Sequence, residues 1–359
     1  MGSIIDYAKK YGDLTFKEKA FDEVDSVMFV MLSYINFDGI LTHSLKHKVR
    51  LEDAIDLFFE KYNTKDLIKD GLGLQSAYKL AGAISHLKRY KDINLYNYVY
   101  SWNSEKQFSA LFLDIDETNV YISIEGTDDY VSGWKEDFEL SYKFPIPSQI
   151  ECITYLNSSI KLFDNKKYII AGHSKGGNLA LVGAMYLNPL LKKKITKVIS
   201  YDGPGLRESQ INSRKYKNIL PKFELVVPNN SVIGLLLSNT TSRTVYLSNR
   251  RGIYAHDALS WQVDDDKFIQ TELSSYSKGV DKTITSWLSL YDDEKRKRFV
   301  VDLFSIFDRC NIESLDKIDP KDLLTLVRET SKIEKESRDM LIELLKIFIS
   351  YNITSKVGE

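Results

Sequence analysis

The segment IIAGHSKGGNLALV, residues 169–182, constrains the fold more than any other stretch of the sequence. A run of β-type apolar residues ends in glycines around Ser174, and an apolar pattern with helical spacing begins directly afterwards. Gly172 to Gly176 fit the pattern GxSxG, in which nearly side-chain-free positions let a strand and a helix cross closely. The segment therefore predicts a strand, a strained turn that exposes Ser174, and a helix.

The middle of the chain alternates between short β-rich runs and helical stretches. The β-rich runs include KYIIAG, KVISYDG, FELVVP and RTVYLS. Such alternation is typical of βα units and of a mostly parallel sheet flanked by helices, so the predicted fold class is α/β. We expect three parts: a helical N-terminal part packed on the core (1–100), an α/β core (101–285) and a helical C-terminal extension (286–359).

Composition excludes several classes of partner and compartment. Forty-nine basic and fifty acidic residues give a net charge of -1, which favours neither nucleic acid nor an anionic membrane. The two cysteines, Cys152 and Cys310, have no metal-ligand or CxxC spacing, which predicts reduced thiols. Neither a secretory signal nor an apolar run of membrane-spanning length is visible, so we expect a cytoplasmic protein without a transmembrane segment.

A serine hydroxyl becomes a good nucleophile only when a base takes its proton. In sites of the strand, turn and helix type the chain order is serine, acid, histidine, so the base must follow Ser174. Of the five histidines, only His256 does so, and it follows the last β-rich run after a short loop. We expect His173 to pack or to bond the backbone, and the other three to be surface or boundary residues, namely His43, His47 and His86.

Three carboxylates lie between the serine and the histidine, namely Asp202, Glu208 and Glu224. Asp202 ends a β-rich run, which would place it at the edge of the sheet where the serine turn emerges. Glu224 lies inside a strand pattern, and Glu208 lies farther along the loop. We therefore expect Asp202 to hold the tautomer of His256, the alternative being that it only shapes the turn in DGPG.

A second informative turn lies in the segment VYISIEGTDDYVSGWKEDFELSY. A predicted strand ends at Gly126 and Thr127, and an aromatic residue and an acid, Trp134 and Asp137, follow after a short loop. In acyl-transfer sites the second oxyanion donor comes from a turn after an earlier strand, where a threonine offers both its N–H and its hydroxyl. Beside the serine turn, GTDD therefore predicts an oxyanion donor.

These two turns resemble those of a known group of proteins. AGHSKGGNLALVGA and IEGTDDYVSGWKEDF are similar to the nucleophile turn and the oxyanion strand of the fungal-type (class 3) lipases of the α/β-hydrolase superfamily. YDGPGL, VPNNSVIGLLL and HDALSWQV are more similar to the bacterial Mbeg1-like proteins. The resemblance implies an α/β-hydrolase fold, Ser174 as nucleophile, His256 as base, and Thr127 with the Lys175 backbone N–H as oxyanion donors.

The chain departs from the class 3 lipases at one position. Those lipases carry the acid of their triad after the next strand, in a segment that here reads VPNNSVIG, and the matching residue is Ser231. No Asp or Glu occurs between Glu224 and His256. Either the acid has moved one strand earlier to Asp202, which we favour, or the triad is incomplete.

Together these features predict a serine hydrolase that cleaves a carboxylic ester, of a lipid or of another acyl group. The alternative is a catalytically weak or inactive hydrolase-like scaffold that binds a partner, which the missing acid and the long helical ends favour. The run VIGLLL predicts an acyl pocket, part of a lid, or a core-facing helix start.

The sequence contains no HExxH motif, no cluster of His and Asp at ligand spacing, and no phosphate-binding loop. We therefore expect no metal and no other cofactor, and we expect DDD at 264–266 to be a solvated loop. The expected partner is a small-molecule or lipid ester, with transient contact to a membrane surface at most and no nucleic acid.

Overall fold

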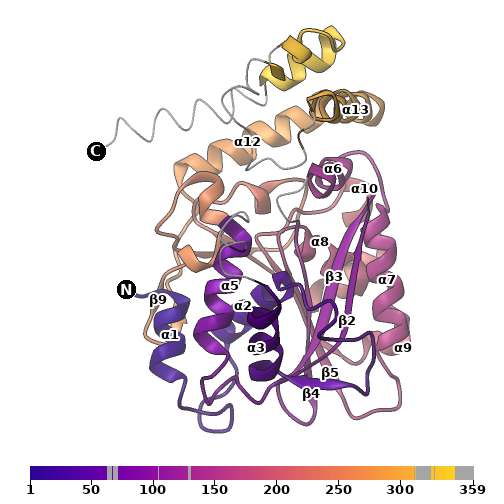
Figure 1. The fold of residues 1–359 in the computed structure, drawn as a ribbon. Coiled ribbons are helices and arrows are strands. Elements are labelled where there is room, and N and C mark those ends of the chain that lie inside the picture. The colour runs from indigo at the N-terminus through magenta and orange to yellow at the C-terminus, as the bar shows by residue number, and fades with distance from the viewer. Residues whose placement is uncertain are drawn as a thin grey trace.

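An eight-stranded sheet forms the centre of the molecule (Figure 1). The computed structural model describes residues 1–62, 67, 72–103, 105–127, 131–310, 312, 325–326 and 328–343. The strands lie side by side in sequence order: β1 (Lys48–Arg50), β2 (Asn94–Trp102), β3 (Gln107–Asp114), β4 (Asn119–Ile124), β5 (Lys167–His173), β6 (Ile195–Tyr201), β7 (Phe223–Pro228) and β8 (Arg243–Tyr246). Strands β1 to β4 pair antiparallel, and β4 to β8 pair parallel. The carboxyl ends of β4 to β8 therefore meet at one edge of the sheet.

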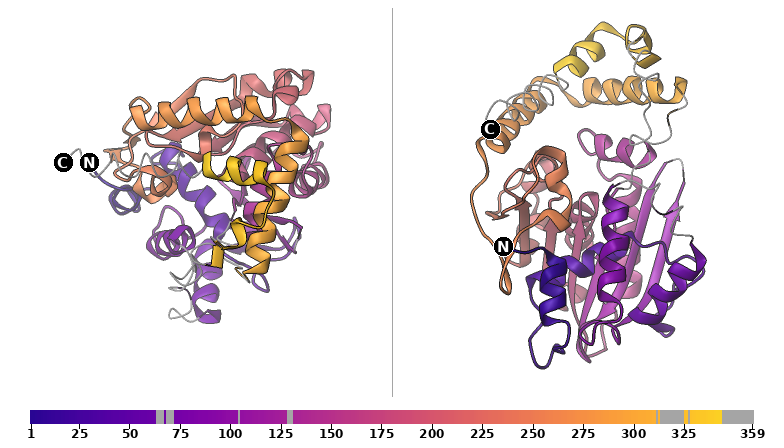
Figure 2. Two further views of the ribbon diagram at one scale, coloured as in Figure 1. Left: turned by 90° about the horizontal axis from the view of Figure 1, so that it is seen from above. Right: turned by 60° about the vertical axis from the view of Figure 1, so that its left-hand side comes forward.

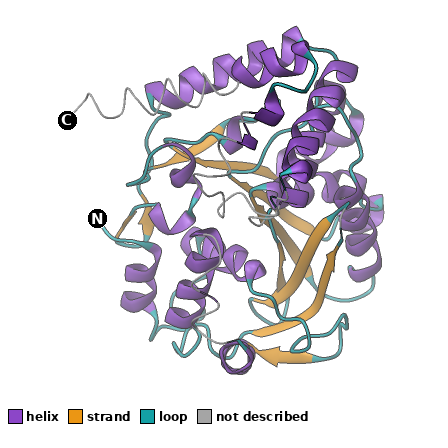
Figure 3. Cartoon of the chain, turned by 45° about the horizontal axis from the view of Figure 1, so that its top comes forward, coloured by secondary structure: helices purple, strands orange, loops and turns teal. Residues whose placement is uncertain are grey.

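Helices cover both faces of the sheet, as Figure 3 shows. One core lies between the sheet and α1 (Ile4–Tyr11), α2 (Glu23–Met31), α3 (Leu51–Lys61) and α5 (Leu72–Ile84). The other lies between the sheet and α7 (Pro147–Ser159), α8 (Lys175–Tyr186) and α11 (Arg214–Ile219). Successive residues of a strand point to opposite faces, so Tyr121 joins the first core while Val120 and Ile122 join the second. This arrangement is the predicted α/β-hydrolase architecture, with a mostly parallel central sheet flanked by helices.

The sheet begins earlier in the chain than the sequence predicts. Strands β1 and β2 lie in the segment that we expect to be helical, and β2 runs across the expected boundary at residue 101. Three residues of β1 are too few to show a periodicity. The alternation of β2 is broken by a register shift between Tyr96 and Val99, where Asn97 has a positive φ of 52°. The division into three parts stays a prediction.

Two C-terminal helices lie beyond the carboxyl edge of the sheet, as Figure 2 shows from two further directions. They are α12 (Ser275–Leu290) and α13 (Asp293–Arg309). Trp287 and Phe299 pack in one cluster with Trp134 of α6 (Val131–Glu139). The VIGLLL run contacts α12 through Val232, in agreement with the core-facing alternative. Residues 344–359 of the expected extension lie outside the described residues.

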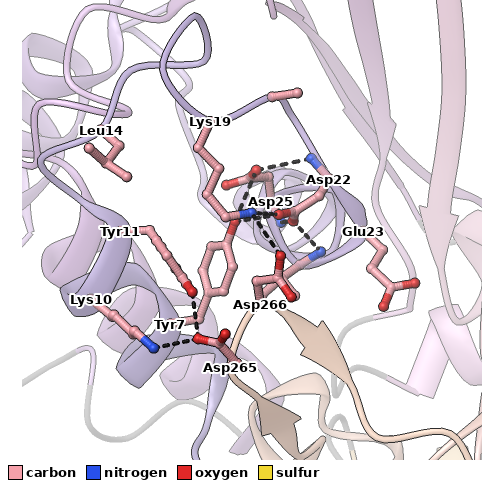
Figure 4. A network of polar contacts seen from close by, with 12 residues as sticks. Tyr7, Lys10, Tyr11, Leu14, Lys19, Asp22, Glu23, Asp25, Asp265 and Asp266 are labelled. Atoms are coloured by element: carbon pink, nitrogen blue, oxygen red, sulfur yellow. Dashed lines mark hydrogen bonds and ion pairs between the residues drawn. The ribbon is translucent and has the colours of Figure 1, made fainter.

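The DDD segment lies at the turn between β9 (Val263–Asp264) and β10 (Lys267–Phe268). Figure 4 shows that Asp265 lies near Lys10 and Tyr11 of α1, and that Asp266 lies near Lys19 in the loop after α1. These aspartates therefore pair with lysines and a tyrosine and hold the hairpin against α1.

A buried ion pair joins the segments around α2. The side chains of Arg89 and Asp25 are fully buried, and the Arg89 Nε donates to Asp25 Oδ1 at 2.9 Å. The guanidinium also donates to the backbone carbonyls of Leu14, Lys19 and Ala20. The Arg89 side chain therefore bonds both α2 and the loop that joins α1 to α2.

None of the helices in the described ranges has both the length and the apolar character needed to cross a bilayer.

Candidate active site

Ser174 occupies the predicted strained turn between β5 and α8. Its φ of 57° and ψ of -134° lie in a region that non-glycine residues rarely adopt, and such strain persists only where the surroundings impose it. A Cβ on Gly172 would lie 2.1 Å from the carbonyl of Gly176, and a Cβ on Gly176 would lie 2.3 Å from the carbonyl oxygen of Ile124. Both glycines of GxSxG are therefore required, because a neighbouring backbone segment occupies the position that a Cβ atom would take.

Asp202 and His256 come together at the same edge of the sheet. Asp202 directly follows β6, has a positive φ of 49°, and is fully buried. His256 ends the 3-10 helix η4 (Gly252–His256), and its Nδ1 lies 2.6 Å from Asp202 Oδ2. With the carboxylate accepting, Nδ1 carries a proton, and in a neutral ring this leaves the lone pair on Nε2.

Ser231, the position at which class 3 lipases would carry the acid, lies beside Asp202. Its Oγ donates to Asp202 Oδ1 at 2.5 Å, and the Gly234 N–H donates to the same oxygen at 3.1 Å. A Cβ on Gly234 would lie 2.4 Å from that oxygen, so the close approach needs glycine. Both oxygens of Asp202 thus have donors, which fixes the orientation of the carboxylate.

The other two carboxylates of the sequence argument lie elsewhere. Glu224 is exposed on β7 and pairs with Lys197 at 2.8 Å. Glu208 is exposed at the start of the short helix α10 (Glu208–Ile211). His256 accordingly has Asp202 as its carboxylate partner in the described structure. The three remaining histidines are exposed on the N-terminal part, namely His43, His47 and His86.

The Lys175 side chain turns into the protein. It is fully buried, and its Nζ donates to Glu136 Oε2 on α6 at 3.0 Å. Glu136 also accepts from the backbone N–H groups of Gln107 and Ser148, at 3.0 and 3.1 Å. The pair therefore ties the serine turn to α6, while the Lys175 backbone N–H begins α8, where helical N–H groups lack an intrahelical acceptor.

Thr127 lies shortly after β4, in a segment that packs against the serine turn. A Cβ on the preceding Gly126 would lie 2.5 Å from the carbonyl oxygen of His173 and 2.7 Å from the Cβ of Ser174. The Thr127 hydroxyl donates to Asp137 Oδ2 at 2.6 Å. Burial raises the pKa of Asp137 to about 6, against the opposing effect of the Lys175 charge.

Sequence reasoning missed several residues that contact these groups. Glu136 and Tyr34 carry no local signal, since their partners lie 39 and 139 residues away in the chain. The sequence indicates Asp137 only as an acid after the GTDD segment. His173 bonds the backbone, as predicted, but it also stacks on His256, which strand periodicity cannot reveal.

Comparison with known proteins places the chain in a family. No curated protein matches the sequence. The chain is similar to the crystal structure of M37 lipase, with 16% identity and a TM-score of 0.33, over 58% of this chain and 68% of that one. It is also similar to a Rhizomucor miehei lipase in complex with its propeptide, with 12% identity and a TM-score of 0.38, over 63% and 67%. The model of the Mbeg1-like family matches residues 84–305, more than half of the chain, and the chain belongs to that family.

Proposed function

We propose that this protein is a serine hydrolase that cleaves a carboxylic ester, with a lipid or another acyl group as substrate. The observation that carries the proposal is the 2.6 Å contact between His256 Nδ1 and Asp202 Oδ2, at the sheet edge where Ser174 lies in its strained turn. A histidine oriented by a buried carboxylate, with its second nitrogen unprotonated, is the base that a serine nucleophile needs.

Each residue has a defined role in the proposed reaction. The Oγ of Ser174 attacks the ester carbonyl while its proton passes to His256 Nε2, and Asp202 stabilises the resulting imidazolium. The imidazolium then protonates the leaving alkoxide, which departs as an alcohol and leaves an acyl group on the serine. Water attacks this acyl-enzyme with His256 as base, and the carboxylic acid leaves as the serine is restored.

The oxyanion of each tetrahedral intermediate needs donors that are already in place. We assign this role to the Lys175 backbone N–H at the start of α8 and to Thr127 in the adjacent segment after β4. The start of a helix favours negative charge, because its first N–H groups are unpaired and the helix dipole is positive there. Loss of one such donor typically lowers kcat by about 10²- to 10³-fold.

The alternative of an inactive scaffold depended on the absence of an acid at the Ser231 position and on the long helical ends. The first reason loses its force because Ser231 donates to Asp202, which in turn contacts His256. We therefore favour the enzyme.

Hydrolysis of p-nitrophenyl esters of increasing acyl length tests the proposal. We expect turnover by the wild type and none above background by Ser174→Ala, with Ser158→Ala on α7 as a matched control at wild-type rate. The proposal fails if a folded wild type hydrolyses none of the esters, or if Ser174→Ala is as active as the wild type.

A further inference from the structure

His173 and His256 form a stacked pair of imidazole rings. Their centroids lie 4.3 Å apart with an interplanar angle of 30°. The Nε2 of His173 lies 2.9 Å from the backbone carbonyl oxygen of His256. Because a carbonyl oxygen can only accept, this contact requires a proton on His173 Nε2. His173 thus contacts both the ring and the backbone of the histidine that we assign as the base.

Tyr34 completes the chain of contacts on the other side of His173. Its hydroxyl lies 2.8 Å from His173 Nδ1, and both residues are buried. In a neutral ring with its proton on Nε2, Nδ1 carries the lone pair, so Tyr34 donates and His173 accepts. Tyr34 therefore favours the tautomer of His173 that can donate to His256.

The surroundings of His173 keep its ring uncharged. Burial, followed by the charge of the neighbouring His256, lowers the pKa of His173 well below its usual value. A neutral ring beside His256 matters for the proposed reaction, because two stacked imidazolium ions would repel each other as the base took up the serine proton.

Tyr34 also touches the oxyanion side of the site. It ends the short 3-10 helix η1 (Leu32–Tyr34), and a Cβ on Gly126 would lie 2.2 Å from its hydroxyl oxygen. Gly126 directly precedes Thr127. The Tyr34 phenol therefore packs against the residue before the proposed oxyanion donor and also bonds His173, the residue next to Ser174.

We propose that Tyr34 and His173 are positioning residues for His256, as a hydrogen-bonded pair that presents a neutral ring to its face and a donor to its backbone. This inference rests on the proposed function. Through these contacts the pair fixes the orientation of the His256 ring, which the proposed proton transfer from Ser174 to Nε2 requires. Tyr34 reaches His256 only through His173.

Three variants separate the two contacts. Tyr34→Phe removes one oxygen atom and keeps the ring, so it tests the tautomer with the least disturbance. His173→Phe keeps a stacked ring but removes the donor, whereas His173→Gln keeps a donor at similar reach but removes the ring. Tyr168→Phe is the matched control, since its hydroxyl bonds Asp164 at 2.9 Å near the start of β5, at the other end of the strand that carries His173.

Ester hydrolysis gives the first readout. We expect kcat to fall about tenfold or more in Tyr34→Phe and His173→Phe, the effect of one lost buried hydrogen bond, with KM within about twofold of wild type. His173→Gln should recover part of this loss, and Tyr168→Phe should match the wild type. A folded Tyr34→Phe with wild-type kcat would overturn the proposal, as would a rise in KM that accounts for the whole loss.

Nitrogen-15 NMR of histidine-labelled protein gives a second readout that needs no activity. It should show His173 as the neutral tautomer protonated on Nε2 in the wild type, with that preference weakened in Tyr34→Phe. An Nδ1-protonated or charged His173 in the wild type would overturn the positioning pair even in an active enzyme. Inactivity of the folded wild type toward all esters would instead refute the proposed function, and with it the catalytic role of the pair.

Discussion

Replacing Asp202 with asparagine turns one carboxylate oxygen into an NH2 group. The neighbours of Asp202 determine which of the two oxygen positions that NH2 group takes. The Gly234 N–H can only donate, and it points at Oδ1 together with the Ser231 hydroxyl. The amide oxygen of Asn must therefore take the Oδ1 position, which turns its NH2 group toward His256 Nδ1. That nitrogen is then forced into the unprotonated state and the proton moves to Nε2.

A His256 protonated on Nε2 cannot accept the proton of Ser174. We therefore expect Asp202→Asn to lower kcat by about 10⁴-fold, which corresponds to about 5 kcal/mol in the activation free energy. KM should change little, because Asp202 is fully buried and does not face a substrate. The assay is steady-state hydrolysis of a short p-nitrophenyl ester, with thermal unfolding to verify that the variant is folded.

The matched control is Glu208→Gln, which neutralises an exposed acid at the start of α10. It should retain the wild-type kcat. If Asp202→Asn is folded and fully active, the assignment of Asp202 is wrong, and so is the reasoning that Ser231 and Gly234 orient its side chain.

Three further predictions concern the surroundings of the site and the fold. Thr127→Val removes the hydroxyl and keeps the backbone N–H; it should lower kcat by about 10²-fold or more with the chain still folded, and unchanged hydrolysis would exclude the Thr127 hydroxyl as an oxyanion donor. Burial raises the pKa of Asp137 from 3.8 to about 6. Between pH 3.8 and about pH 6, the Asp137 carboxyl is therefore protonated in the native state and ionised in the unfolded chain. Stability should therefore fall as pH rises through this window, and the Asp137→Asn variant should gain about 3 kcal/mol relative to the wild type by pH 7 in denaturant titrations. An equal pH dependence of the two proteins would contradict the buried environment. Arg89→Met should cost about 3–5 kcal/mol of unfolding free energy, because it leaves Asp25 buried without its cation, and Arg89→Met combined with Asp25→Leu should recover part of that loss.

Much of the candidate site could be predicted because its parts have local signatures. The strand, GxSxG and helix around Ser174 are contiguous, and the glycines are needed for backbone contacts that any such turn makes. The expected chain order of serine, acid and histidine then limited the base to His256 and the acid to three carboxylates. The parallel sheet brings these three segments to one edge, so chain order and strand ends were sufficient to bring Asp202 to His256.

The contacts that sequence reasoning missed join residues far apart in the chain. Tyr34 meets His173 across 139 residues, and Arg89 meets Asp25 across 64. Neither pair has a periodic or motif signal, because only tertiary packing brings the partners together. Strand β2 was missed for a different reason, since its bulge at Asn97 breaks the alternation that marks a strand.

The most direct test of the central claim is intact-protein mass spectrometry after reaction with a fluorophosphonate, followed by digestion to locate the adduct. The proposal predicts one adduct per chain, on Ser174, that is absent in Ser174→Ala and forms far more slowly in Asp202→Asn. A folded wild type without an adduct, or an adduct that persists in Ser174→Ala, would contradict it.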